Sequence, residues 1–158
     1  MSGSCVELNL KEVKVLQALF EKAKLSTAEK EQLLTNLSVE VEMQTLDRFD
    51  TKIDPEGKKW KPIADSTRKY LNKYFGGRET SLLVRTGDLR LSAGPPPEGD
   101  KPVFIGDDSI FIGSAMEYAS YIQDGTYKMP ARPMFGIGTG DYPALIKITT
   151  DFLAARLT

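Results

Sequence analysis

The sequence contains no histidine and only one cysteine, and these two shortages remove several kinds of chemistry. Without an imidazole group there is no Ser-His-Asp triad, no histidine-based zinc site and no histidine acid–base catalysis. The single cysteine, Cys5, cannot form an internal disulfide or a cysteine-rich metal site, and the histidine that often activates a cysteine nucleophile is absent. Most of the familiar catalytic and metal-binding arrangements are therefore excluded by composition.

Long apolar runs are also absent: none approaches the ~20 residues that a membrane-spanning helix needs. The first residues, MSGSCVELNLKEVKVL, lack the basic start and apolar centre of a signal peptide. We therefore expect a soluble chain that is not exported and has no membrane partner. Its 158 residues fit a single domain, residues 1–158, that is long enough to bury a core.

The net charge of −1 conceals an uneven distribution along the chain. Residues 1–50 carry six Lys and Arg against nine Asp and Glu, residues 52–90 carry ten against five, and residues 91–158 carry five against eight. The basic middle can meet phosphate, or it can meet the acidic ends of an identical chain, and the sequence leaves both open. The cations expected to make such contacts with DNA or an acidic partner are Lys58, Lys59, Lys61, Arg68 and Lys69.

Apolar residues recur at helical spacing near the start of the chain. Residues 9–23 predict one amphipathic helix. A second helix is predicted after Ser26, where Glu29 three residues later completes a capping box, and it continues to about Phe49. We expect these two helices to form a helical hairpin over residues 1–50.

The remaining residues, 51–158, are expected to complete an α+β fold with a small antiparallel sheet. Val103–Ile105 and Ile110–Ile112 are β-branched and aromatic segments around a Gly-Asp-Asp-Ser turn, which predicts a β-hairpin. The three prolines before it favour an extended loop over residues 93–102. Thr86–Leu89 predicts a turn or cap that leads into alternating apolar and polar residues.

Three further helices are predicted in this part of the chain. A short one follows an Asp-Pro-Glu-Gly turn and covers residues 65–74, before a Gly-Gly pair. Another covers residues 116–122 and stops at Gly125. The C-terminal helix covers residues 141–157, with an aspartate as its cap and Pro143 in its first turn.

Two patterns resemble parts of active sites, and neither has the residues or the setting that catalysis requires. The carboxylates Asp107 and Asp108 fall at the tip of the predicted hairpin, where aspartate is favoured for backbone reasons. The glycines of FGIGTGD lack the lysine and the Ser or Thr of a phosphate-binding loop. We therefore expect no enzyme activity, no metal and no cofactor.

Residues 125–137, GTYKMPARPMFGI, form a segment that is too apolar and too stiff for an ordinary loop, and we call it the strap. Pro130 and Pro133 fix their own φ and favour extended neighbours, so ordering the strap on binding costs little entropy. Arg132 between them suits a carboxylate on a partner. The alternative is that the strap packs over its own sheet. The single tryptophan, Trp60, has the same two interpretations: it fills the edge of the core, or it anchors an interface.

Five short motifs occur in an order that resembles the phage virion morphogenesis family, the Mu-type and related tail-completion proteins of tailed phages. They are Arg48-Phe49, DPEGKKWKPIADST (54–67), TGDL (86–89), IGSAMEYASYIQDG (112–125) and MPARPMFGI (129–137), followed by the closing helix. The resemblance covers residue 45 to the end. This chain departs from the family pattern at Ile122, where histidine is common before the glutamine, and at Met134, which precedes Phe135 where the family often has phenylalanine and then leucine.

The resemblance implies a non-enzymatic structural protein that completes the tail or the head–tail neck of a virion as a ring of identical subunits, such as a hexamer. It implies assembly in the host cytoplasm, a final place in the neck, and contacts with other neck, connector or tail proteins. DNA passing through the ring is a further partner to consider, and the alternative function is a DNA-contacting accessory protein of the connector that uses residues 52–90. The residues expected at the subunit interface are Trp60, Gly87, Tyr118, Gln123, Gly125, Met129, Pro130, Arg132, Pro133 and Phe135.

Overall fold

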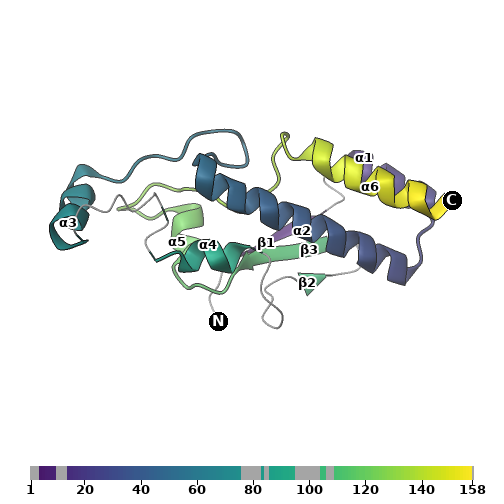
Figure 1. The fold of residues 1–158 in the computed structure, drawn as a ribbon, viewed down its shortest axis with the longest axis horizontal. Coiled ribbons are helices and arrows are strands. Elements are labelled where there is room, and N and C mark those ends of the chain that lie inside the picture. The colour runs from purple at the N-terminus through teal and green to yellow at the C-terminus, as the bar shows by residue number, and fades with distance from the viewer. Residues whose placement is uncertain are drawn as a thin grey trace.

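The long helix α2 (Thr27–Thr51) forms the axis of an elongated, helix-rich molecule (Figure 1). A computed structural model describes residues 4–9, 14–75, 83, 86–94, 104–105 and 109–157. Helices α1 (Lys14–Ala23) and α6 (Tyr142–Leu157) lie side by side along one flank of α2. Short strands and helix α4 (Asp88–Ala93) lie along its other flank. Mixed α and β structure is therefore present, with helix dominant.

The strands pair antiparallel in the order β1–β3–β2. β1 (Ser4–Asn9) pairs along the whole of β3 (Ser109–Ser114), and β2 (Phe104–Ile105) pairs with the other edge of β3. β2 and β3 coincide with the two arms of the predicted hairpin, while the turn between them lies outside the described residues. In β3, Ile110 and Ile112 are buried, so this strand contributes to the core.

The predicted helical hairpin over residues 1–50 is wrong at its start. Residues 4–9 are a strand, and the first helix begins only at Lys14. The apolar residues Val6 and Leu8 alternate with polar neighbours, which is the period of a strand, and they stand opposite Ile112 and Ile110 in the sheet register. In addition, α1 and α2 both pack against α6, so the unit is a three-helix layer that needs the end of the chain.

Helix α2 begins and ends where the sequence predicts. Ser26 is its N-cap, with the reciprocal hydrogen bonds of a capping box to Glu29. At the other end Lys52 adopts a left-handed φ of 61°, and its backbone N–H donates to the carbonyl of Arg48. The apolar stripe of the helix is buried and supplies much of the core; it consists of Leu33, Leu34, Leu37, Val41 and Phe49.

The capping box makes a prediction for stability against pH. Hydrogen bonds from Ser26 lower the pKa of Glu29 below its ordinary value of 4.5, and the nearby Arg156 acts in the same direction. A carboxyl whose pKa is lower in the folded state stabilises the fold above its unfolded pKa, and this stabilisation disappears as the pH falls through the folded pKa. We therefore expect Glu29→Gln to lower the free energy of unfolding at pH 7. The difference in this free energy between the variant and the wild type should vanish at roughly pH 2–3, below the usual pKa range of carboxyl groups. Denaturant unfolding at both pH values measures it; an unchanged difference would contradict the assignment.

The shorter helices agree with the sequence only in part. α3 (Asp65–Phe75) matches the predicted helix, and the glycines expected to end it lie outside the described residues. The alternating residues after Gly87 are not extended but form α4, because Gly87 takes a left-handed φ of 91° and turns the chain into a helix. α5 (Ala119–Asp124) begins later than expected and ends, as predicted, at Gly125 with φ 77°. Most of the predicted 93–102 loop lies outside the described residues.

Candidate functional site

The candidate site is the strap, residues 125–137, which residues of several other motifs contact. It follows α5, runs to the C-terminal end of α2 and ends just before α6. It contains almost no regular structure beyond an isolated bridge between Thr126 and Met129. Its backbone polar groups are instead paired with side chains from other parts of the chain, as the next paragraphs describe. This pattern is expected for an irregular segment that is buried, because unpaired backbone groups are costly there.

Arg48, on the last turns of α2, binds the end of the strap. One terminal nitrogen of its guanidinium donates to the carbonyl oxygens of Met134 and Gly136, both at 2.9 Å. The other donates to Oδ2 of Asp141 at 2.6 Å, and the same oxygen accepts the backbone N–H of Gly138 at 2.7 Å. Burial lowers the pKa of Arg48, and the Asp141 carboxylate opposes that shift. The arginine is 5% exposed, so it is an internal ion pair that fixes the strap to α2 and to the start of α6.

The sequence predicts Asp141 as the cap of α6, but its side chain binds other groups. Asp141 lies just before the helix, and its side chain accepts hydrogen bonds from Arg48 and from the backbone N–H of Gly138. Arg48 was noted only as part of a motif and not as a site residue. Its burial is visible in the sequence, because it stands seven residues after Val41 on the apolar stripe of α2.

Trp60 fills the edge of the core, as one of its two interpretations states. It is 6% exposed, its ring meets Phe49 edge to face at 5.7 Å between centroids, and its indole N–H donates to the carbonyl of Pro133 at 2.8 Å. The burial of the ring favours this interpretation over that of an anchor for a second subunit. Trp60 holds the strap from the side of the 52–64 segment.

Arg132 is also internal, which favours packing within its own subunit over a contact with a carboxylate of a neighbouring subunit. It is 4% exposed, and its guanidinium donates to the carbonyl oxygens of Lys61 and Pro62 at 2.8 and 3.0 Å. Its backbone N–H donates to the carbonyl of Ile122. Burial lowers the pKa of Arg132. The residue ties three segments of one chain together.

Gln123 completes the attachment from α5. Its Oε1 accepts the backbone N–H groups of Met134 and Phe135 at 2.9 and 3.1 Å, and its Nε2 donates to the carbonyl of Phe135 at 2.9 Å. An amide side chain is the group that both donates and accepts in this way. The departure at Ile122, next to Gln123, leaves this role intact.

Truncation of this glutamine should be measurable as a loss of stability. We expect Gln123→Ala to lower the free energy of unfolding by about 2 kcal/mol, because three backbone groups of the strap lose their partners. The matched control is Gln32→Ala on the exposed side of α2, for which a change within about 0.5 kcal/mol is expected. Denaturant unfolding compares the two; equal effects would mean that the glutamine does not hold the strap.

Glycines allow the strap to approach its neighbours this closely. A Cβ on Gly125 would lie 2.6 Å from the backbone nitrogen of Ala131, and one on Gly138 would lie 1.5 Å from the carbonyl oxygen of Pro55. Phe135 is buried at 3% exposure, while Met129, Pro130 and Pro133 are partly buried. The proposed interface residues of the strap are therefore mostly inside the subunit.

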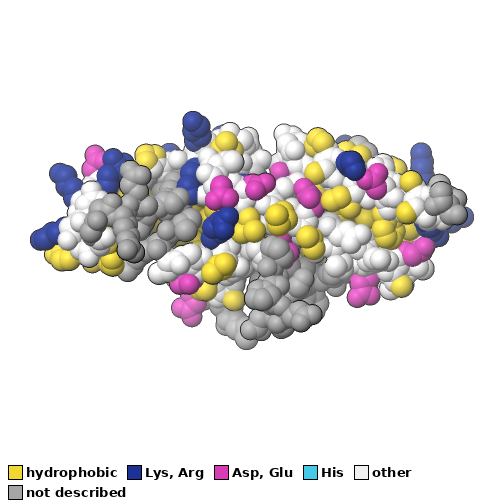
Figure 2. Space-filling view, viewed as in Figure 1, with side chains coloured by type: hydrophobic (Ala, Val, Ile, Leu, Met, Phe, Trp, Pro, Cys, Tyr) yellow, Lys and Arg dark blue, Asp and Glu magenta, His cyan; other side chains and the backbone are white. Residues whose placement is uncertain are grey.

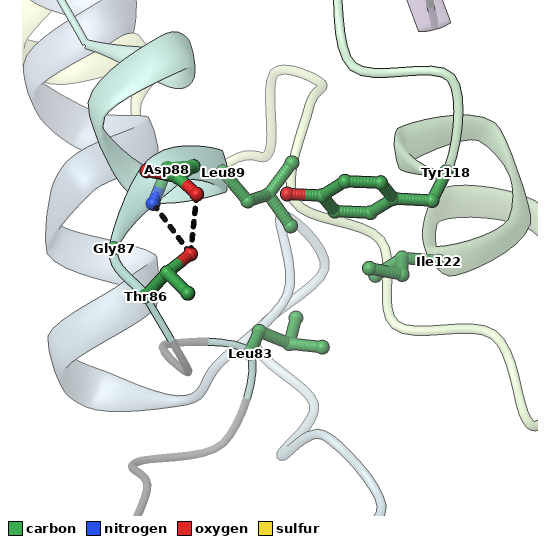
Figure 3. Close-up of a pocket in the computed structure, with 7 residues that line it drawn as sticks. All are labelled: Leu83, Thr86, Gly87, Asp88, Leu89, Tyr118 and Ile122. Atoms are coloured by element: carbon green, nitrogen blue, oxygen red, sulfur yellow. Dashed lines mark hydrogen bonds between the residues drawn. The ribbon is translucent and has the colours of Figure 1, made fainter.

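Gly87 and Tyr118 lie together in an open pocket between α4 and α5. Figure 3 shows Tyr118 and Leu89 pointing towards one another across the pocket. In this view Leu83 lies below Leu89, and Ile122 lies below Tyr118. Thr86 donates to the Asp88 carboxylate at 2.5 Å and so shapes the turn at Gly87. Tyr118 is 42% exposed. Of the predicted interface residues, Tyr118 is the one whose ring remains available on the surface.

The five cations predicted to contact DNA or an acidic partner are exposed, as such a contact requires. Lys58 and Arg68 are close to acidic neighbours, Glu56 and Asp65, at 2.5 and 3.8 Å. The Glu56 carboxylate raises the pKa of Lys58. The five cations are Lys58, Lys59, Lys61, Arg68 and Lys69.

Within the described residues, no group of three or more Cys, Asp or Glu side chains is arranged to hold a metal ion. In the same part of the chain, none of the helices combines the length and the apolarity needed to cross a membrane. The site is thus a set of backbone attachments around the strap and a partly apolar pocket beside it.

These attachments involve the same motifs that carry the family resemblance, and comparison with known proteins agrees. The model of the phage virion morphogenesis family matches residues 10–154. The chain belongs to this family. It is 34% identical over 90 residues to Mu-like prophage FluMu G protein 1 of Haemophilus influenzae, a stretch that covers 57% of this chain and 56% of that protein. The chain thus spans a little more than half the length of this curated relative. No solved structure matches the chain.

Proposed function

We propose that this protein is a structural component that completes the tail, or the neck between head and tail, of a phage or prophage particle, and that it acts as a ring of identical subunits. The observation that carries the proposal is the family match over residues 10–154, which makes a role in virion assembly the function of the class. The relative's name attaches that protein to a Mu-like prophage, which supports the same role here.

The internal fixing of the strap supports a structural role. Arg48, Trp60 and Gln123 bind the backbone of the strap, and Arg132, which belongs to the strap, binds the backbone carbonyls of Lys61 and Pro62. A segment held from several sides is preorganised, and a preorganised subunit loses little entropy when it joins an assembly. In this account the strap makes the subunit rigid, and residues on the outer surface contact neighbouring copies.

Particle assembly without the protein tests the function. A lysogen or phage lacking this gene should yield separate heads and tails, or tails with unfinished ends, and expression of the wild-type chain in trans should restore complete particles. Electron microscopy and plaque counts measure both. Particles that mature with intact necks and full infectivity in the absence of the protein would contradict the proposal.

Contact with DNA inside the connector is a second candidate, and the exposure of the five cations predicted to make such contacts favours it. Each phosphate contact adds to the dependence of binding on salt, because bound counterions are released. We expect duplex binding, if it is part of the function, to weaken steeply with salt and to be lost in a Lys58→Ala, Lys59→Ala, Lys61→Ala triple variant. Binding that does not respond to salt or to these substitutions would remove this candidate.

A further inference from the structure

Helix α3 (Asp65–Phe75) is the most poorly buried helix among those whose side chains are described. None of its residues is buried, and Figure 1 shows it at one end of the molecule, apart from α2, α6 and the sheet. The extended 52–64 segment leads to it. A helix that makes so little use of its own subunit usually requires another surface to stabilise it, because isolated helices of this length are marginal in water.

The exposed side of α3 carries a cluster of aromatic rings. Tyr70 is 56% exposed, Tyr74 59% and Phe75 42%. The Tyr70 ring lies 4.8 Å from that of Tyr74 and 6.4 Å from that of Phe75, measured between centroids. Tyrosine and phenylalanine supply large contact areas at interfaces, and tyrosine is enriched among the residues that dominate binding. Aromatic residues four apart on one helix form a ridge of the kind that fits a groove between two other helices.

A shallow, open groove lies between α2 and α6. It is lined by Asn36 and Val39 from α2 and by Ile148, Asp151 and Phe152 from α6. Figure 2 shows hydrophobic side chains gathered along α2 and between it and α6, whereas Lys and Arg side chains surround the end of the molecule that α3 forms.

Val39, which lines the groove, and Met43 beyond it form an exposed apolar row on α2 with the same spacing as Tyr70 and Tyr74 on α3. Val39 is 41% exposed, and Met43, four residues later on the same helix face, is 47% exposed. Val39 and Met43 on α2 are four residues apart, and so are Tyr70 and Tyr74 on α3. Rows of side chains with this spacing can interdigitate when two helices pack.

Charge also matches between the two surfaces. α3 carries three basic residues, Arg68, Lys69 and Lys73, against the single acidic Asp65. α2 and α6 together carry seven Asp and Glu against four Lys and Arg. Opposite net charge favours encounter and fixes the orientation of the contact. A partner with the chemistry of the α2–α6 groove is thus available in every other copy of this chain.

We propose that α3 is a docking arm that inserts Tyr70 and Tyr74 into the α2–α6 groove of the next copy. The arm is at one end of the molecule and the groove is between α2 and α6, so the contact is heterologous and repeats from copy to copy, as a closed ring requires. This inference depends on the proposed ring and names the two surfaces that build it.

The test uses two variants with one damaged surface each. Tyr70→Ser with Tyr74→Ser damages the arm, and Val39→Lys with Met43→Lys damages the groove. Each should weaken self-association by at least about 30-fold, the effect of losing one dominant interface residue. The matched control is Tyr127→Ser, which removes a tyrosine that is 92% exposed and should assemble like the wild type. Circular dichroism confirms that each variant is folded.

Mixing the two damaged variants gives the decisive result. One intact arm and one intact groove remain, so the mixture should form a 1:1 dimer that does not grow, while each variant alone stays monomeric in sedimentation velocity. If both variants assemble like the wild type, or if the mixture does not pair, the arm does not use this groove, although the ring survives. A wild-type chain that remains monomeric even with tail tubes contradicts the ring itself. Variants that assemble normally but lose duplex binding assign α3 to DNA instead.

Discussion

Replacing Arg48 with alanine should lower the free energy of unfolding by about 3–5 kcal/mol, the usual cost of removing one partner of a buried ion pair. The guanidinium is the donor for the carbonyls of Met134 and Gly136 and for the carboxylate of Asp141, which is 17% exposed. Without it a charged group and two carbonyls lose their partner in the interior. Denaturant unfolding of wild type and variant measures the difference.

Two further variants distinguish the buried pair from a general effect of losing an arginine. Arg68→Ala removes an arginine that is 56% exposed and lies 3.8 Å from Asp65, so its effect should stay within about 1 kcal/mol. Arg48→Ala and Asp141→Ala should together cost less than the sum of the single changes, because the second change removes the unpaired charge. Additive effects, or a small cost for Arg48→Ala, would mean that the pair does not hold the strap.

Gly138→Ala should be the most damaging change of a single methyl group, with a loss of about 3 kcal/mol or more. The new Cβ would lie 1.5 Å from the carbonyl oxygen of Pro55, and this is backbone that cannot rotate away. To relieve the overlap, the end of the strap has to leave the 52–64 segment, and the contacts of Arg48 are lost with it.

The control for this change lies two residues away. A Cβ on Gly140 meets no atom within 4 Å, so Gly140→Ala should change the free energy of unfolding by no more than about 0.5 kcal/mol. Thermal or denaturant unfolding of the two alanine variants side by side is sufficient. If Gly138→Ala were as stable as Gly140→Ala, the close approach of the strap to Pro55 would be contradicted.

Local signals in the sequence were sufficient for several elements. The capping box at Ser26 and Glu29, the turn before Lys58 and the stop at Gly125 depend on residues close together in the chain, and all three are present. The first strand is not predicted because its short alternating pattern stands next to a stronger helical one, and its pairing partner β3 lies about a hundred residues away.

The candidate site, in contrast, depends mainly on contacts between distant parts of the sequence. The sequence located the strap and recognised its stiffness, but it left open whether the strap faces inward or outward. That choice depends on long-range contacts, such as Arg132 to Lys61 and Trp60 to Pro133, which no local spacing encodes. The sequence predicts α3 as a helix but does not show whether its aromatic residues are exposed or buried, because that depends on the fold.

An internal role for the strap changes what a defect in assembly means. If the strap is internal, substitutions such as Gln123→Ala reduce assembly only through loss of the folded subunit, whereas substitutions on α3 or in the α2–α6 groove reduce assembly and leave stability unchanged. Measuring both quantities for each variant separates the two classes.

Amide hydrogen exchange in a monomer tests the central claim most directly. The arm variant with Tyr70→Ser and Tyr74→Ser supplies a subunit that should remain unassembled, and the informative amides are those of Arg132, Met134 and Phe135, whose N–H groups bind Ile122 and Gln123. The account predicts that these amides are protected in the monomer to the same degree as the core of α2. Rapid exchange in the monomer, with protection appearing only after subunits associate, would show that the strap is organised by its neighbours and would contradict the account.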